Sequence, residues 1–429
     1  MQRSAWIPLV ALWCICLSAA GGAEPTASSP APAPWPQWRG PTRDGRVAGS
    51  RWPESLQGDS LQPLWRIPLG PSYSGPVVSD ELVFTTQSRN KEVEVVSAVD
   101  RRTGEIRWSV EWPGGMSVPF FAKSNGDWIR STPAFDGECL YVAGMRDVLV
   151  CLAATTGQER WRVDFVKDAN SPPPDFGFVC SPLVDDEAVY VQAGASVAKL
   201  NKQTGAIIWR TLSDSGGMYG SAFSSPILAD LLGKRQLIVQ TRQKLAGVDP
   251  QTGEVLWSQV VPSFRGMNIL TPVVVGDAIF TSSYQNKSWL YRIAREQDRF
   301  TVAEAWNNKA QGYMSTPVVA EGYAYLHLGN QRFACINLHS GERTWTSQPF
   351  GKYASLVLQG DRILALDAQG VLLLIKANPE NFELLDSRKV SEEETWAHLA
   401  ISGEELYVRE LEALAAYRWR SVPRPSSAP

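Results

Sequence analysis

The stretch Asp249-Pro250-Gln251-Thr252-Gly253-Glu254-Val255-Leu256-Trp257 is a tight turn followed by a strand that ends on tryptophan. Glycine accepts the positive φ that such a turn requires, and the polar residues before it can bond the turn backbone. The pattern [Thr/Ser]-Gly-x-x-x-Trp occurs four more times, at residues 103–108, 156–161, 204–209 and 340–345. Trp161, Trp209 and Trp257 follow one another at intervals of 48 residues. A repeat of this length indicates an architecture built from repeated structural units.

A second signal, a small residue followed by proline, opens each unit. It occurs at Gly75-Pro76, Thr132-Pro133, Ser181-Pro182, Ser225-Pro226, Thr271-Pro272 and Thr316-Pro317. Because this signal repeats around the chain, we interpret its serines and threonines as architectural and not as a catalytic nucleophile, which should be singular. Short apolar strands separated by turn residues follow each proline, and no amphipathic helix of ordinary length interrupts them. The sequence therefore predicts an all-β fold of four-stranded antiparallel units, the pattern of β-propeller blades.

Counting the units predicts eight blades within residues 63–420. Six units end on tryptophan, a seventh runs from about 353 to 390 without one, and an eighth begins near Trp396. That last unit has only three strands, while residues 63–68 read as a fourth strand with no unit before it. Pairing the two would close the ring and remove the exposed edges of an open sheet. We predict that this N-terminal strand closes the propeller.

The segments before and after the repeat region lack the repeat pattern and are interpreted separately. Residues 1–23 contain a basic residue, an apolar stretch and small residues, which predicts a cleaved signal peptide; a membrane anchor is disfavoured because the stretch is shorter than the ~20 residues that a spanning helix needs. We expect a flexible linker at 24–34, an ordered strap lying on the fold at 35–62 and a disordered tail at 421–429. No later segment is apolar enough to span a membrane, so the sequence predicts an exported monomer, periplasmic or secreted.

Composition and scattered reactive residues exclude several other functions. The formal net charge of −3 shows no nucleic-acid footprint. After the signal, Cys139, Cys151, Cys180 and Cys335 remain, without metal-ligand or haem-attachment spacing. Cys139 and Cys151 flank one predicted hairpin and could pair, although buried free thiols are the simpler interpretation. The histidines fall in separate units, where structural roles are expected: His327, His339 and His398.

At this point the residues resemble a known family. The Asp-x-x-Thr-Gly-x-x-x-Trp pattern is similar to the pyrroloquinoline-quinone-type (PQQ-like) β-propeller repeat, over roughly residues 64–420. One branch of that family comprises quinoprotein dehydrogenases, which hold the quinone and calcium. The other comprises cofactor-free propellers such as the BamB-type periplasmic proteins, which assist outer-membrane protein assembly. Residues 35–45 also resemble the start of many uncharacterised exported bacterial proteins of this repeat class.

The dehydrogenase branch implies features that this sequence does not match. It generally carries an adjacent Cys-Cys disulfide, a Glu and an Asn for calcium, and an Asp as base; no Cys-Cys pair occurs here, and no counterpart of the others can be placed. We therefore expect the chain to be closer to the cofactor-free branch, with no catalytic residue, cofactor or metal. PQQ with calcium is expected only under the alternative of a periplasmic quinoprotein dehydrogenase.

Two sets of residues receive predicted roles. Residues just before each first strand should meet on one face of the ring, near its axis, where aromatic and arginine side chains favour recognition. This predicted binding rim comprises Trp128, Arg130, Phe178, Tyr219, Arg265, Asn268, Tyr313, Tyr353 and Trp396, with Phe176 and His398 beside them. The alternative is that some of them plug the central channel. Structural docking between blades is predicted for Trp65, Trp108, Trp161, Trp209, Trp257, Trp306 and Trp345.

The functional prediction is a non-catalytic exported scaffold that binds a protein or cell-envelope component through the rim face. A sugar- or polymer-binding module would use the same aromatic residues. The opposite face, built from the Thr-Gly turns and the flanking residues Arg101, Arg102, Lys202 and Gln251, should tolerate substitution.

Overall fold

The structure is a computed structural model that describes Met1 and residues 34–49, 51–216 and 222–420. The chain divides into two units, Met1–Ala31 and Pro32–Pro429, and the second contains all of the described secondary structure. The predicted signal peptide beyond Met1, nearly all of the predicted linker, the predicted tail and Tyr219 lie outside the described residues. None of the helices in these ranges combines the length and the apolar character that crossing a membrane requires.

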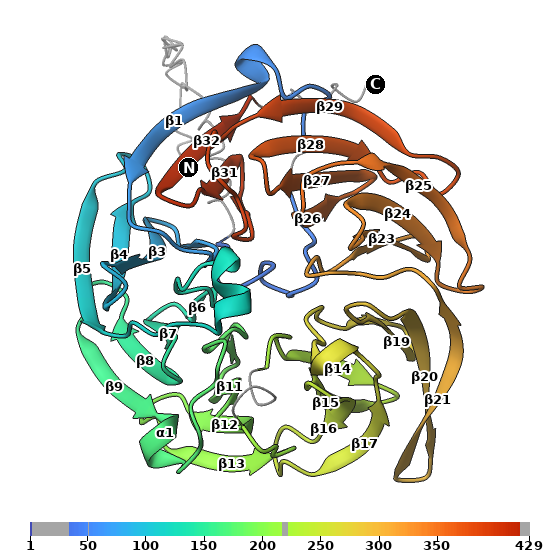
Figure 1. Ribbon diagram of the computed structural model, residues 1–429. Helices are drawn as coiled ribbons and strands as arrows, with labels where there is room; N and C mark the ends of the chain where they lie inside the picture. The colour runs from blue at the N-terminus through green and yellow to red at the C-terminus, as the bar shows by residue number, and fades with distance from the viewer. Residues whose placement is uncertain (2–33, 50, 217–221, 421–429) are drawn as a thin grey trace. The chain divides into compact units, whose positions relative to one another are not determined.

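Eight four-stranded antiparallel sheets follow one another around a ring in the second unit (Figure 1). The first blade consists of β2 (Val77–Val78), β3 (Leu82–Arg89), β4 (Val93–Asp100) and β5 (Ile106–Pro113), and the second of β6 (Ala134–Phe135), β7 (Cys139–Gly144), β8 (Val148–Ala153) and β9 (Glu159–Asp164). The third consists of β10 (Leu183–Val184), β11 (Ala188–Ala193), β12 (Ser196–Asn201) and β13 (Ile207–Thr211), and the fourth of β14 (Ile227–Leu231), β15 (Lys234–Gln240), β16 (Lys244–Val248) and β17 (Val255–Val260).

The other four blades continue the same order. They are β18 (Val273–Val275), β19 (Ala278–Ser282), β20 (Ser288–Glu296) and β21 (Arg299–Asn308); β22 (Val318–Ala320), β23 (Tyr323–His327), β24 (Arg332–Asn337) and β25 (Arg343–Pro349); β26 (Ala354–Gln359), β27 (Arg362–Asp367), β28 (Val371–Lys376) and β29 (Glu383–Lys389); and β30 (Ala400–Ser402), β31 (Glu405–Arg409) and β32 (Ala413–Trp419) with β1 (Leu61–Pro68). The helices are short: η1 (Gly58–Ser60), η2 (Phe120–Asn125), α1 (Phe165–Asp168) and η4 (Phe264–Gly266). The predicted all-β, eight-bladed propeller is confirmed.

The N-terminal strand closes the ring. β1 pairs antiparallel with β32, from Leu61 opposite Trp419 to Pro68 opposite Ala413, and it forms the outer strand of the eighth blade (Figure 1). A register shift between Pro63 and Trp65 interrupts the ladder once, where a proline cannot donate a bond. The closure predicted from the incomplete last unit is therefore confirmed.

Two buried arginines join the last blade to the first. The Arg409 guanidinium donates to the carbonyl of Gly70 (2.6 Å), between β1 and β2, to that of Thr86 (3.2 Å) in the first blade, and to carbonyls of its own blade. Arg101 forms an ion pair with Glu405 across the same seam, with Nε and Oε2 2.6 Å apart. Removing one partner of such a buried pair is costly. The prediction that Arg101 tolerates substitution is therefore not supported by its position, which is buried and paired.

Indole rings connect neighbouring blades in a repeated way. The Trp161 Nε1 donates to the carbonyl of Lys202 in the next blade, at 2.9 Å, and the ring lies against Gly205. A Cβ added to Gly205 would lie 2.7 Å from this ring, and the backbone φ of +73° favours glycine. The same bond to the following blade is made by Trp65, Trp108, Trp209, Trp306 and Trp345. These contacts explain why glycine and tryptophan recur together in the sequence.

Trp257 departs from this arrangement. Its Nε1 donates at 2.7 Å to the Gln236 side chain of its own blade, and the ring is 5 % exposed. The next blade has no Thr-Gly turn between β20 and β21, because that hairpin is lengthened to Glu296 and Arg299. The indole therefore lacks the glycine surface of the next blade and lies against Gly247 of its own blade instead, where an added Cβ would overlap the ring.

Residues 35–47, which precede β1, cross the centre of the ring, where they are drawn in blue in Figure 1, and we call them the central segment. Arg39 donates to the carbonyls of Thr316 (2.8 Å) and Pro317 (2.7 Å), and Arg43 donates to those of Ser181 (3.0 Å) and Pro182 (2.8 Å). Burial lowers the pKa of Arg39 to about 10 and that of Arg43 to about 9, so both remain charged at neutral pH. This segment thus ties the third blade to the sixth across the axis.

The four described cysteines, Cys139, Cys151, Cys180 and Cys335, are free and buried. Cys139 lies opposite Ala153 and Cys151 opposite Tyr141, so the two thiols of the predicted hairpin are diagonal neighbours across the ladder. They act as small apolar side chains in the core.

Two buried carboxyl groups also connect blades. Glu94 accepts from the Met145 amide (2.7 Å) and from the Trp112 indole (2.8 Å), and Asp147 accepts from the Gly194 amide (2.9 Å). Burial raises the pKa of each to about 7. The folded protein therefore binds these protons up to a higher pH than the unfolded chain, where such groups titrate near ~4.

This difference predicts a pH dependence of stability. Since the folded state holds more protons between about pH 4 and pH 7, these groups lower the free energy of unfolding as the pH rises through that window. The neutral variant Asp147→Asn should keep the Gly194 bond and raise the free energy of unfolding at pH 8 by up to about 4 kcal/mol, because folding raises this pKa by about three units and each unit corresponds to ~1.4 kcal/mol.

Urea unfolding at pH 5 and pH 8 measures the effect. The exposed variant Asp298→Asn serves as control and should leave the pH dependence unchanged. An Asp147→Asn protein that loses stability equally at both pH values would contradict the assignment.

Candidate functional site

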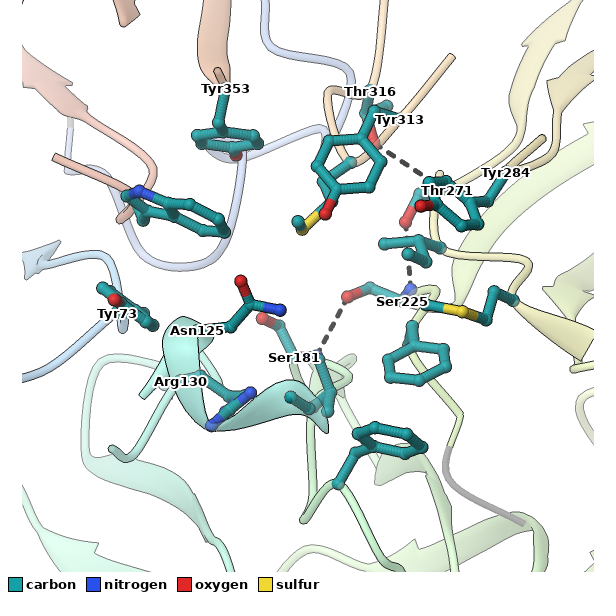
Figure 2. A pocket seen from close by; sticks show the side chains of 18 of the residues that line it. Tyr73, Asn125, Arg130, Ser181, Ser225, Thr271, Tyr284, Tyr313, Thr316 and Tyr353 are labelled. Atoms are coloured by element: carbon teal, nitrogen blue, oxygen red, sulfur yellow. Dashed lines mark hydrogen bonds between the residues drawn. The ribbon is translucent and has the colours of Figure 1, made fainter. Parts of the chain in front are cut away.

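A cavity of about 380 Å³ lies at the centre of the ring (Figure 2). Every blade contributes to its lining, from Tyr73 before the first blade to Trp396 and His398 before the innermost strand of the eighth, and Trp38 of the central segment completes it. Because antiparallel strands alternate in direction, this lining and the Thr-Gly turns lie at opposite ends of each blade. We call the end that carries the cavity the cavity face.

The repeated prolines set which side chains line the cavity. The residue three positions before each proline lines it in all six units: Tyr73, Arg130, Val179, Phe223, Ile269 and Met314. The residue directly before the proline lines it in five: Thr132, Ser181, Ser225, Thr271 and Thr316. Side chains of an extended chain alternate between two sides, so positions separated by two residues face the same way.

The five residues directly before proline form a hydroxyl belt that links consecutive blades. The amide of each one donates to the hydroxyl of the next: Thr132 to Ser181 (3.1 Å), Ser181 to Ser225 (2.9 Å), Ser225 to Thr271 (2.9 Å) and Thr271 to Thr316 (3.2 Å). The last three bonds are drawn in Figure 2. The Gly75 amide of the first blade adds a bond to Thr132, at 3.1 Å. These bonds connect neighbouring blades, in line with the architectural interpretation of these residues.

Aromatic rings cover much of the remaining wall. Trp396 stacks on Tyr73 and on Tyr353, with ring centroids 5.4 and 5.9 Å apart. On another side, Tyr284 contacts Tyr313 at 5.2 Å. The third group consists of Phe176 and Phe223, whose rings lie within 6.0 Å of the Arg242 guanidinium. The wall can therefore accept a flat apolar group.

The charge of the lining has one sign. Arg130, Arg242 and Arg265 belong to it, and among the described lining residues there is no aspartate or glutamate. Burial lowers the pKa of Arg130 to about 10, so this guanidinium stays charged at neutral pH. His398 is neutral, because burial and the nearby Arg39 lower its pKa to about 3. The cavity thus favours a ligand that carries negative charge.

Exposed aromatic side chains surround the mouth of the cavity. Phe120 and Phe121 of η2 are 84 % and 48 % exposed, and Phe264 of η4 is 44 % exposed. Phe121 and Phe264 also line the cavity, and Phe120 contacts Phe121 edge to face at 5.5 Å. We call these three residues the aromatic lip. Such exposure of large apolar rings is typical of interaction surfaces.

The structure brings together part of the predicted rim. Arg130, Arg265, Tyr313, Tyr353 and Trp396 line the cavity, as do Phe176 and His398. Phe178 and Asn268 do not line it: Phe178 packs against Phe165, and the Asn268 amide donates to the carbonyls of Arg242 and Val261, both at 3.1 Å. Trp128 lies outside the lining with the Lys91 ammonium 5.8 Å from its ring, and Tyr219 is not described.

Comparison with known proteins decides the family. Residues 92–347, more than half of the chain, match the family described as outer membrane protein assembly factor BamB. The chain belongs to this family. The predicted resemblance to BamB-type propellers, in preference to the quinoprotein dehydrogenases, is thereby confirmed.

Individual members of the BamB family are distant in sequence. The factor from Yersinia pestis is 23 % identical over 57 % of this chain, and the match covers 63 % of that protein, less than two thirds of its length. The factor from Moranella endobia is 20 % identical over 72 % of this chain and 70 % of its own. The crystal structure of BamB from Moraxella catarrhalis superimposes with a TM-score of 0.62 at 14 % identity, over 85 % of this chain and 99 % of that one. The last similarity shows the fold.

The described lining of this BamB-family cavity does not fit the calcium ion of the quinoprotein alternative. Calcium prefers carboxylate and carbonyl oxygens as ligands. The described part of the lining contains no acidic residue. Elsewhere in the described ranges, no three His, Cys, Asp or Glu residues are grouped so that they could hold a metal ion.

Several lining residues were missed at the sequence level: Trp38, Tyr73, Phe121, Phe223, Arg242, Phe264 and Tyr284. The spacing from proline could have identified Tyr73 and Phe223, because both occupy the third position before it. Phe178 and Asn268 lie four positions before proline, but this position does not by itself exclude a residue, because Tyr313 occupies it and lines the cavity. The residues of the aromatic lip carry no repeat signal, since they belong to connections that differ between blades.

Proposed function

We propose that this protein is a non-catalytic scaffold in the assembly of outer-membrane proteins, and that it binds a protein partner through its cavity face. The observation that carries the proposal is the aromatic lip, three exposed phenylalanines at the mouth of a cavity, on a chain of the BamB family. Aromatic and arginine side chains supply most of the energetic anchors in protein interfaces.

We choose the cavity face because the side chains at the two ends of the blades differ in how free and how varied they are. At the Thr-Gly end, polar side chains are used by the turns themselves; Asp249, for example, accepts from the amides of Gln251 (2.8 Å) and Thr252 (3.3 Å). Turns of this kind repeat from blade to blade and offer little asymmetry. The cavity face differs in every blade, which a specific partner requires.

Export is part of the same proposal. A scaffold for outer-membrane proteins would act outside the cytoplasm, in the periplasm, and the basic, apolar and small residues of 1–23 support this location.

Site-specific photocrosslinking tests the proposal. A photoreactive phenylalanine analogue at Phe120 or Phe264 should crosslink the protein to components that assemble outer-membrane proteins, in cells that express it at natural levels. The matched control carries the analogue at Arg102 or Gln251, on the Thr-Gly end, and should crosslink weakly. Crosslinks to assembly components from the Thr-Gly end alone would contradict the choice of face, and an unchanged amount of outer-membrane proteins in cells lacking the protein would contradict the function.

A further inference from the structure

The hydroxyl belt presents hydrogen-bond donors to the cavity. Each hydroxyl oxygen of the belt accepts a bond from a backbone amide of the preceding blade. None of these hydroxyls donates to an acceptor within the described residues. Since a hydroxyl group both accepts and donates, the protons of the belt remain available to a ligand.

More donors converge from the walls (Figure 2). The side chains of Asn125, Tyr313 and Tyr353 line the cavity, and no hydrogen-bond partner for them occurs in the described ranges. Burial raises the pKa of Tyr313 and of Tyr353 to about 12, so both phenols keep their protons at neutral pH. These side chains face the open space of the cavity, so their protons can be donated to a ligand that enters it.

Arg130 adds a fixed positive charge. Its Nε donates to the Trp128 carbonyl (3.1 Å) and its Nη2 to the Gly126 carbonyl (2.8 Å), which holds the guanidinium in place. Its Nη1 has no partner among residues that the structure describes. The described lining therefore presents a positioned cation next to several neutral donors and contains no carboxylate itself. The Asp127 carboxylate, outside the lining, balances part of the Arg130 charge.

We infer that the central cavity binds a carboxylate group that is attached to an aromatic ring. The carboxylate would accept from Arg130, from the belt and from the tyrosine hydroxyls, and the ring would lie against the aromatic wall. Charge-assisted bonds of this kind are stronger than neutral ones. A volume of about 380 Å³ lies in the range of small-ligand pockets.

This inference deepens the proposed function and rests on it for one point, that the group would belong to the partner at the cavity face. A free aromatic acid has the same chemistry and would bind through the same atoms. The two sources differ in the rest of the ligand: a polypeptide would leave through the open mouth past the aromatic lip, whereas a small molecule would end inside.

Isothermal titration calorimetry with matched probes tests the inference. Indole-3-propionate is compared with its neutral primary amide, and an acetylated, amidated peptide Gly-Trp-Glu-Trp-Gly is compared with the same peptide carrying Gln. We expect at least one acid to bind with one-to-one stoichiometry, at least ~10-fold more tightly than its neutral counterpart, because only the acid pairs with the guanidinium. Binding of the free acid alone assigns the site to a small molecule, and binding of the peptide alone assigns it to the partner; either supports the inference.

Three variants locate the binding. Arg130→Gln should weaken the acid at least ~10-fold and leave the neutral probe unchanged, and Tyr353→Phe should weaken it several-fold with an unchanged melting temperature. Arg292→Gln is the control, because this arginine is exposed on β20 and pairs with Asp277. If Arg130→Gln does not fold, the affinity of the combined Asn125→Ala and Tyr353→Phe protein for the acid tests the inference in its place.

Equal binding of acid and neutral probes, or no binding of either acid, would overturn the inference. So would full affinity in the folded Arg130→Gln or in the combined Asn125→Ala and Tyr353→Phe protein. A protein that crosslinks to assembly components from the aromatic lip, yet binds neither acid, would disprove the carboxylate site and leave the proposed function standing.

Discussion

A protein that begins at Leu69 is expected to lose its cooperative thermal transition and to self-associate. This truncation removes β1, so the backbone groups of β32 that now pair with Leu61 to Pro68 become an open edge. Exposed edges of this kind pair with other chains. The same deletion removes Arg39 and Arg43, which connect opposite blades through the centre.

The matched control begins at Trp35 and keeps both the central segment and β1. It should melt like the full protein and remain monomeric in size-exclusion chromatography with light scattering. A monomeric protein from Leu69 with an unchanged melting temperature would show that β1 does not hold the ring closed.

The second large effect is expected for Trp161→Ala. The ring is 9 % exposed between two blades and its Nε1 bonds the Lys202 carbonyl, so truncation leaves a cavity and an unpaired acceptor. Removing a large buried aromatic side chain costs ~3–5 kcal/mol, which urea unfolding would measure. Ile208→Ala on the outer strand β13 is the control, because Ile208 is 51 % exposed and should cost little.

A double-mutant cycle identifies the contact itself. Gly205→Ala alone should destabilise the protein, since its Cβ would lie 2.7 Å from the Trp161 ring at a φ of +73°. In the Trp161→Ala background the steric part of this cost should disappear and only the backbone part remain. Strictly additive costs would mean that the indole does not rest on the glycine.

The repeats made most of the fold predictable. The Thr-Gly and small-residue-proline signals return in successive units, so blade number, strand order and closure followed from spacing. The contact of Trp161 with the next blade could be predicted from its size and position, whereas the turn of Trp257 toward Gln236 could not. That difference depends on the next blade, whose lengthened hairpin removes the glycine surface, and on Gly247 across the ladder, which leaves room for the indole in its own blade.

The candidate site was predictable only in part, for two physical reasons. Side-chain direction before each proline depends on a two-residue alternation, and a shift of one position separates Phe178, in the core, from Val179, in the cavity. The seam arginines and the aromatic lip are singular, so repetition gives them no signal. Arg409, for example, reaches carbonyls more than three hundred residues earlier, at Gly70 and Thr86.

The closure of the ring by β1 also determines when the native state can form. Leu61 pairs with Trp419, so a strand synthesised near the beginning of the propeller waits for one synthesised at its end. Forming contacts between residues so far apart in the sequence costs the entropy of closing a very long loop before the contacts stabilise the fold, and this slows folding. Until the final strand is synthesised, the strands at both ends of the incomplete ring keep unpaired edges that can pair with another chain. A nascent chain of this kind would gain from being held apart from its neighbours, because a second chain could supply the missing strand as readily as its own.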